Sequence, residues 1–168
     1  TISETVDYLN ANGRKVGLVK VRLYRPFSVK HLVAAIPSTV KKISVLDRTK
    51  EPGSIGEPLY LDVVAALRDT EFANVPVYTG RYAPKIVGGR FGLGSKDTTP
   101  AQIIAVFKNT EKKRFTIGIN DDVTNLSLAL DENPDTTPAG ITSCKFWGLG
   151  ADGTVGANKN SVKIIGDH

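Results

Sequence analysis

The stretch VGLVKVRLYRPFSVKHLVAAIPSTVKKISVL, residues 16–46, carries the pattern that decides the fold. It opens with an apolar run at 16–21 and closes with another at 43–46, and both are typical of β-strands. Between these runs, Ser28 is placed to cap a helix that Pro37 closes. The order strand, helix, strand predicts an α/β unit with a parallel sheet.

The same alternation continues on both sides of this stretch. Ser3 can cap a helix that runs to about Asn12, and the residues after 46 predict, in order, a helix at 59–68, a strand at 85–89, a helix opening near Pro100 with Thr98 or Thr99 as its cap, a strand at 115–119 and an edge strand at 124–130. Helices that alternate with short strands predict an α/β fold, a three-layer sandwich with a mostly parallel sheet. A polar run at 131–140 is typical of a linker, so we expect one domain at 1–130 and the start of another at 141–168.

Composition narrows the classes of function. The net charge of +5 is spread along the chain without an aromatic-lined basic stripe, so we expect no nucleic-acid partner. No apolar run reaches the length of a membrane span, and the polar opening residues do not suggest a signal peptide, so we expect no membrane contact. One cysteine, Cys144, cannot build a disulfide, a zinc site or an iron–sulfur cluster within the chain, and we expect it to be a buried strand residue of a cytoplasmic protein.

A glycine-rich turn near the end is the strongest candidate site. The apolar run at 144–147 predicts a strand, the glycines at 148, 150 and 153 fit the phosphate-binding spacing G-x-G-x-x-G, and residues 157–165 predict a helix. We expect the amides of Gly153, Thr154 and Val155 to face a phosphate, with the Thr154 hydroxyl as a further donor and Asp152 capping amides or meeting a hydroxyl. The alternative is a tight turn that packs a strand on a helix and binds nothing.

Four loops should meet at the carboxyl edge of the sheet, where α/β proteins bind ligands: 22–27, 47–53, 90–96 and 120–122. Their arginines and lysines, placed beside glycines, could hold a phosphate or carboxylate from a neighbour. The alternative is that Asp47, Arg48 and Glu51 form local ion pairs and that Gly53, Gly89 and Gly92 serve turns. No catalytic or metal-binding residue is predicted: His31 fits a surface or cap position, and Asp121 and Asp122 fit turn caps.

Three longer stretches are informative through their whole sequence, and not only through the spacing of single residues. Residues 19–28, 45–63 and 144–160, supported by 85–96 and 115–126, closely resemble the pyruvate:ferredoxin (flavodoxin) oxidoreductases. The resemblance implies that residues up to about 130 form that family's second domain, which is similar to the transketolase C-terminal domain. Residues from about 141 would then be the truncated start of the third domain.

The resemblance also implies a function. An intact enzyme of this family decarboxylates pyruvate, transfers the acetyl unit to coenzyme A and passes electrons to ferredoxin or flavodoxin. Thiamine diphosphate with Mg²⁺ and the iron–sulfur (4Fe-4S) clusters are held by other domains, so we expect this piece to be non-catalytic and to hold no cofactor alone. The third domain contributes to coenzyme A binding, through the loop that corresponds here to Asp152, Gly153, Thr154, Val155 and Gly156. The implied partners are the other domains and a second subunit.

Two further readings stay open at this point. The same domains occur in the fusion enzyme that reduces NADP and in assimilatory sulfite reductase subunits. The glycine-rich turn would also suit an autonomous nucleotide- or phosphate-binding module.

Overall fold

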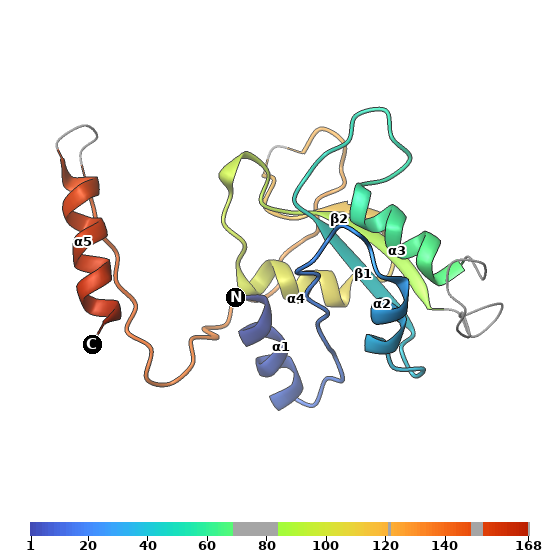
Figure 1. The fold of residues 1–168 in the computed structure, drawn as a ribbon, viewed down its shortest axis with the longest axis horizontal. Helices are drawn as coiled ribbons and strands as arrows, with labels where there is room; N and C mark the ends of the chain where they lie inside the picture. Colours follow the sequence, from blue (N-terminus) through green and yellow to red (C-terminus); the bar gives the residue numbers. More distant parts are fainter. Residues whose placement is uncertain (69–83, 121, 149–152, 168) are drawn as a thin grey trace. The chain divides into compact units, whose positions relative to one another are not determined.

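Short β-branched and apolar runs, each joined to the next by a helix, build a parallel sheet (Figure 1). The computed structural model describes residues 1–68, 84–120, 122–148 and 153–167. The chain divides into two units, Thr1–Thr136 and Thr137–His168. The first unit holds the sheet, whose strands lie in the order β1-β2-β3 with both neighbouring pairs parallel.

The predicted helices and three of the predicted strands are present in the predicted order. The strands of the first unit are β1 (Lys42–Asp47), β2 (Lys85–Arg90) and β3 (Arg114–Thr116). Its helices are α1 (Ile2–Ala11), α2 (Val29–Ala35), α3 (Pro58–Arg68), the short 3₁₀ turn η2 (Leu93–Ser95) and α4 (Pro100–Lys108). The second unit contains α5 (Thr154–Gly166).

Helices cover both faces of the sheet. On one face, Leu32 of α2 and Val63 of α3 pack with Val45 of β1. On the other face, Ile103 of α4 packs with Phe115 of β3. Because successive side chains of a strand point to opposite faces, β1 and β2 supply residues to both cores, whereas β3 contributes Phe115 to the second core. The predicted three-layer α/β sandwich with a parallel sheet is therefore confirmed.

Two predicted helix caps are confirmed in atomic detail. The Ser28 hydroxyl accepts a hydrogen bond from the His31 amide at the start of α2. At α4, the Thr99 hydroxyl accepts from the Gln102 amide while the Gln102 side chain accepts from the Thr99 amide, which makes a capping box. The prediction for α1 was wrong in its cap, since the helix follows Thr1 and no side chain caps it.

The predicted strand at 16–21 is wrong. Residues 14–24 have no helix or strand, and Leu18, Val19 and Val21 are exposed. The Asn10 side chain both donates to the Val16 carbonyl and accepts from the Val16 amide, so it satisfies the backbone where a neighbouring strand would. Residues 16–21 therefore form no ladder with a neighbouring strand. In the described part of the chain, β1 pairs only with β2.

Three more predicted strands are shorter or missing. The strand predicted at 115–119 ends at Thr116, because Gly118 turns the chain at a φ of 82°. The predicted edge strand at 124–130 is reduced to one bridge, between Thr116 and Ser127. The strand predicted at 144–147 is not formed, since 141–148 has no regular structure and no partner strand within the described residues of its unit. The helix that should follow is confirmed as α5, which begins three residues earlier than predicted.

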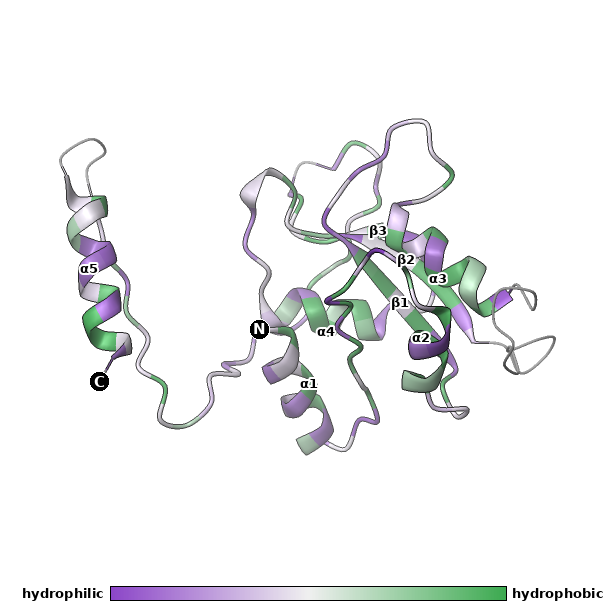
Figure 2. Ribbon diagram, viewed as in Figure 1, coloured by the Kyte–Doolittle hydropathy of each residue, from purple (hydrophilic) through white to green (hydrophobic). Residues whose placement is uncertain are grey.

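Helix α5 carries both polar and apolar residues around its surface (Figure 2). Val155, Val162, Ile164 and Ile165 are all exposed within their unit. A helix of this kind normally buries one face against another element. No helix among the described residues combines the length and apolar character that crossing a bilayer requires.

Candidate functional site

The start of α5 holds most of the residues predicted to contact a phosphate. Gly153 precedes the helix in the left-handed conformation, with a φ of 82° and a ψ of −6°. Thr154 is the first helical residue and is half-buried, whereas Val155 and Gly156 are exposed. Asp152 and the glycine at 150 lie outside the described residues. Four of the five predicted contact residues are therefore brought together at one helix end.

Gly148, which precedes the loop, lies close to the start of α5. A Cβ on Gly148 would come within 3.0 Å of the Thr154 side chain, so this position allows a close approach of the two segments. A Cβ on Gly156 would meet nothing within 4 Å. Packing within the unit therefore explains the glycine at 148 and leaves an open surface at 156.

Electrostatics at this helix end favour an anion. The first turn of α5 contains no acidic residue, and its last turn contains Lys163. The first amides of a helix have no intrahelical acceptor and carry the positive end of the helix dipole. A phosphate placed there would meet donors without meeting a neighbouring carboxylate from the same turn.

The segment before the loop is exposed, which corrects the prediction for Cys144. Its thiol lies on the surface of the unit instead of in a strand, because no strand forms there. Trp147 is 79% exposed, and the Lys145 ammonium lies 4.5 Å from the centre of its ring. This distance makes a cation–π contact.

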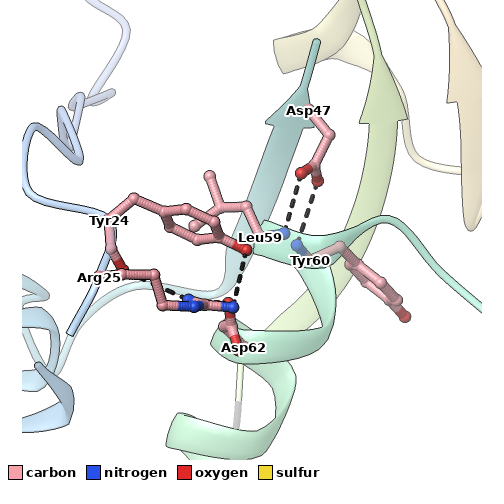
Figure 3. A network of polar contacts seen from close by, with 6 residues as sticks. All are labelled: Tyr24, Arg25, Asp47, Leu59, Tyr60 and Asp62. Carbon is pink, nitrogen blue, oxygen red and sulfur yellow. Dashed lines mark hydrogen bonds and ion pairs between the residues drawn. The ribbon is translucent and has the colours of Figure 1, made fainter. Parts of the chain in front are cut away.

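In the first unit, the carboxyl edge of the sheet is organised by Asp47 (Figure 3). One carboxylate oxygen accepts from the Leu59 amide at 2.9 Å and the other from the Tyr60 amide at 3.1 Å. Asp47 is buried, and this burial raises the pKa of its carboxyl group, although the two amide bonds act in the opposite direction. Asp47 thus caps α3 and makes no ion pair with Arg48.

Two other acidic groups of this edge also have partners within the unit. Glu57, before α3, pairs with Arg90 at the end of β2 over 2.5 Å. Asp122 accepts from the Thr124 amide and hydroxyl and from the Ser127 amide, as predicted for a turn cap. Asp121 lies outside the described residues.

The glycines of these loops divide into two groups. Gly53 and Gly92 have φ values of 78° and 63°, as turns require. Gly89 does not serve a turn, because it lies inside β2 and its Cα faces the Phe115 ring. The turn interpretation is therefore confirmed for two of the three glycines.

The loop at 22–27 is tied to α3 by a network that the sequence did not predict (Figure 3). Arg25 donates to Asp62 over 2.8 Å and to the Tyr24 hydroxyl over 3.2 Å, and it lies 4.0 Å above the Tyr24 ring. Desolvation, followed by the neighbouring Asp62, raises the pKa of Tyr24. Arg25 and Asp62 are 37 residues apart in the sequence, so no local pattern could have revealed this pair.

His31 is exposed and contacts the cap of its own helix. Its Nδ1 lies 2.6 Å from the Ser28 hydroxyl, which is the local role that we expected. Across the residues that the structure covers, no group of three or more His, Cys, Asp and Glu side chains is arranged to hold a metal ion.

Comparisons with known proteins agree with one another. The family described as pyruvate:ferredoxin oxidoreductase core domain II matches residues 1–90. A pyruvate-flavodoxin oxidoreductase of Enterobacter agglomerans is 58% identical, and a pyruvate:ferredoxin oxidoreductase of Moorella thermoacetica is 57% identical. Each alignment covers 99% of this chain and 14% of the relative. A probable pyruvate-flavodoxin oxidoreductase of Escherichia coli K12 is 52% identical over the same shares.

Proposed function

Because the chain belongs to the pyruvate:ferredoxin oxidoreductase family, we propose that it is a non-catalytic part of an enzyme that converts pyruvate and coenzyme A to acetyl-coenzyme A and CO₂, with electrons passed to ferredoxin or flavodoxin. The relatives are named for both electron acceptors, flavodoxin and ferredoxin, which supports this proposal. The chain spans only 14% of the length of these relatives. We therefore assign catalysis and electron transfer to other parts of the polypeptide. We further propose that the enzyme acts in the cytoplasm as a homodimer.

The domain assignment is part of this proposal. Residues 1–130 would form the second domain of the family, residues 131–140 a linker, and residues 141–168 the start of the third. The family match to residues 1–90 supports the first assignment. Lys108, in the last turn of α4, pairs with Asp131 and Glu132, which ties the beginning of the linker to the first unit.

The residues of this chain do not fit one cofactor of such an enzyme, the iron–sulfur cluster. Thiamine diphosphate with Mg²⁺ supplies the decarboxylation chemistry, and iron–sulfur clusters carry the electrons. A cluster takes about four cysteine thiolates, and this chain has one cysteine. We therefore propose that this part of the enzyme binds and orients groups whose chemistry other domains supply.

The specific role that we propose is to bind a phosphate of coenzyme A at the start of α5. Gly153, Thr154, Val155 and Gly156 would supply amides and the Thr154 hydroxyl, and Asp152 would complete the loop. The observation that carries this proposal is the exposed first turn at Val155 and Gly156, which contains no acidic residue. Coenzyme A carries a pyrophosphate and a ribose phosphate, which are groups that helix amides bind.

The full-length enzyme provides the test. We expect Thr154→Arg to raise the KM for coenzyme A by about tenfold or more, since a bulky side chain would replace the hydroxyl beside the phosphate. The KM for pyruvate should stay unchanged. Asn160→Arg adds the same charge and bulk at an exposed position of α5 farther from the loop, and it should alter neither constant. Equal effects of the two variants, or an equal rise in both KM values, would contradict the proposal.

A second candidate is an autonomous nucleotide-binding module. It is favoured by the division of the chain, since residues 137–168 form a unit of their own with the loop and its helix. Calorimetry of the isolated chain with coenzyme A distinguishes the two. Absence of tight binding agrees with a site that other domains complete, whereas micromolar binding favours the autonomous module.

A further inference from the structure

The carboxyl edge of the sheet gathers the loops that follow its strands. The last pairs of the ladder, Asp47 with Arg90 and Arg90 with Thr116, show that the three parallel strands end side by side. The loop after β1 and the loop after β3 both lie at the top of the first unit in Figure 1. A protein that contacts this end of the sheet therefore meets several loops at once.

The most exposed large apolar side chains of the first unit lie on the loops of this edge. Among the described residues of the unit, the three highest exposed fractions are 95% for Val123, 78% for Ile55 and 73% for Leu23. Val123 follows β3, Ile55 follows β1, and Leu23 precedes Arg25, which is bonded to Asp62 of α3. Single exposed apolar residues are common, whereas their gathering at one end of a sheet is typical of a surface that another protein covers.

Ile55 is held in place by its own turn. The Ser54 hydroxyl donates to the Gly56 carbonyl over 2.7 Å and accepts from the Gly56 amide over 3.3 Å. The Ser54 amide donates to the Glu51 carbonyl over 3.2 Å. Because these bonds fix the backbone on both sides of Ile55, little conformational freedom is lost when a partner covers its side chain.

Val123 is fixed in a similar way. Asp122, the residue before it, accepts from the Thr124 amide over 3.0 Å and from the Ser127 amide over 2.5 Å. The turn therefore presents an apolar side chain that has nothing to pack on within the described part of the first unit, although the backbone around it is ordered. Such an arrangement suits an anchor residue of an interface.

The charges around these anchors argue against a second copy of the same surface. Exposed cations outnumber exposed carboxylates among the described residues of the four loops of this edge: Arg22, Arg48, Lys50 and Lys96 against Glu51 and Asp97. In a two-fold dimer the same patch meets itself, so these cations would face one another. A partner with an acidic surface fits better.

We propose that this edge of the sheet docks against another domain of the same, longer polypeptide, and that the partner surface receives Val123, Ile55 and Leu23 within an acidic rim. The chain covers 14% of the length of its relatives, so most of a polypeptide of this family lies outside it. Two domains joined in one chain meet at a high effective concentration, so a few apolar anchors are sufficient. This surface belongs to the first unit, whereas the proposed coenzyme A contact belongs to the second.

The accessibility of single introduced thiols in the full-length enzyme tests the proposal. Ile55→Cys and Val123→Cys place a thiol on the surface, and Thr39→Cys places one at an exposed position before β1, at the opposite edge of the sheet. The thiols are alkylated with a maleimide, and mass spectrometry of the peptides measures each rate. We expect the thiols at 55 and 123 to react about tenfold or more slowly than the thiol at 39, because a covered thiol reacts only when the interface opens. Equal rates at the three positions overturn the proposal.

Two further comparisons identify the partner. Lys50→Glu, added to Ile55→Cys, should accelerate alkylation at 55, since it places a carboxylate against the acidic rim, whereas Lys41→Glu at the opposite edge should not. Equal rates in these two variants overturn the acidic partner. Native mass spectrometry of Ile55→Asp should show the same number of subunits as the wild type. Dissociation into fewer subunits would assign the surface to a second copy and overturn the assignment to a domain of the same polypeptide.

Discussion

Glu57 and Arg90 form an ion pair over 2.5 Å that joins the start of α3 to the end of β2. The Glu57 side chain is 5% exposed and the Arg90 side chain is 18% exposed. Two charged side chains with so little exposure to solvent are stable only when each neutralises the other. The pair therefore holds a helix against a strand at the edge where the loops gather.

Glu57→Gln should destabilise the first unit by roughly 3 kcal/mol, because Arg90 would keep its charge without a carboxylate beside it. The free energy of unfolding in urea, followed by circular dichroism, measures this loss. Glu51→Gln makes the same chemical change at an exposed position and should stay within about 0.5 kcal/mol of the wild type. A loss of similar size in both variants would show that the ion pair does not matter.

Gly89→Ala should be among the most damaging small changes in the sheet. A Cβ at this position would lie 2.1 Å from Cε2 and 2.3 Å from Cζ of the buried Phe115 ring, so strand or ring must move. We expect a loss of more than about 3 kcal/mol. Gly17→Ala is the matched control, since a Cβ there meets nothing within 4 Å. The same urea experiment compares the two, and a loss below about 1 kcal/mol at Gly89 would contradict the packing.

The sequence predicts those elements of this fold whose signals are local. Helix caps such as Ser28 and Thr99 are satisfied within four residues, and they were predicted correctly. The prediction of a strand at 16–21 is wrong because it rests on an apolar pattern alone, whereas a strand also needs a neighbouring strand to pair with. In this chain the side chain of Asn10 takes that neighbour's place at Val16.

The same distinction applies to the candidate sites. The glycine-rich turn and the loops at the carboxyl edge could be found because glycines, arginines and apolar runs mark them locally. The pairs Arg25–Asp62 and Glu57–Arg90 could not, since 37 and 33 residues separate their partners. The contact of Arg48 with Gly92 needs the strand order as well, which no local pattern contains.

Lys42 should contribute stability at the end of α4. Its ammonium donates to the carbonyls of Val106, Phe107 and Asn109 at 3.3, 2.8 and 2.7 Å, groups that the last turn of a helix leaves without partners. Lys42→Met keeps the length of the side chain and removes the donors, so we expect a loss of about 1–3 kcal/mol. Lys41→Met, at an exposed neighbour, should change the free energy of unfolding by less than about 0.5 kcal/mol. Equal losses would exclude a capping role for Lys42.

Asp122 should make the first unit sensitive to acid. Its hydrogen bonds, first to Thr124 and then to Ser127, hold the pKa of its carboxyl group well below the ordinary 3.8. A carboxylate with a lowered pKa stabilises the folded state at pH values above its ordinary pKa, and this contribution is lost as the pH falls toward the folded-state value.

The difference in urea midpoint between the wild type and Asp122→Asn should therefore be constant near neutral pH and shrink below a pH of about 3.8. Asp7→Asn removes a carboxylate from an exposed position of α1 and controls for the change in net charge. A difference for Asp122→Asn that stays constant down to acidic pH would mean that the charge of Asp122 does not hold the turn, and that an amide oxygen accepts its hydrogen bonds equally well.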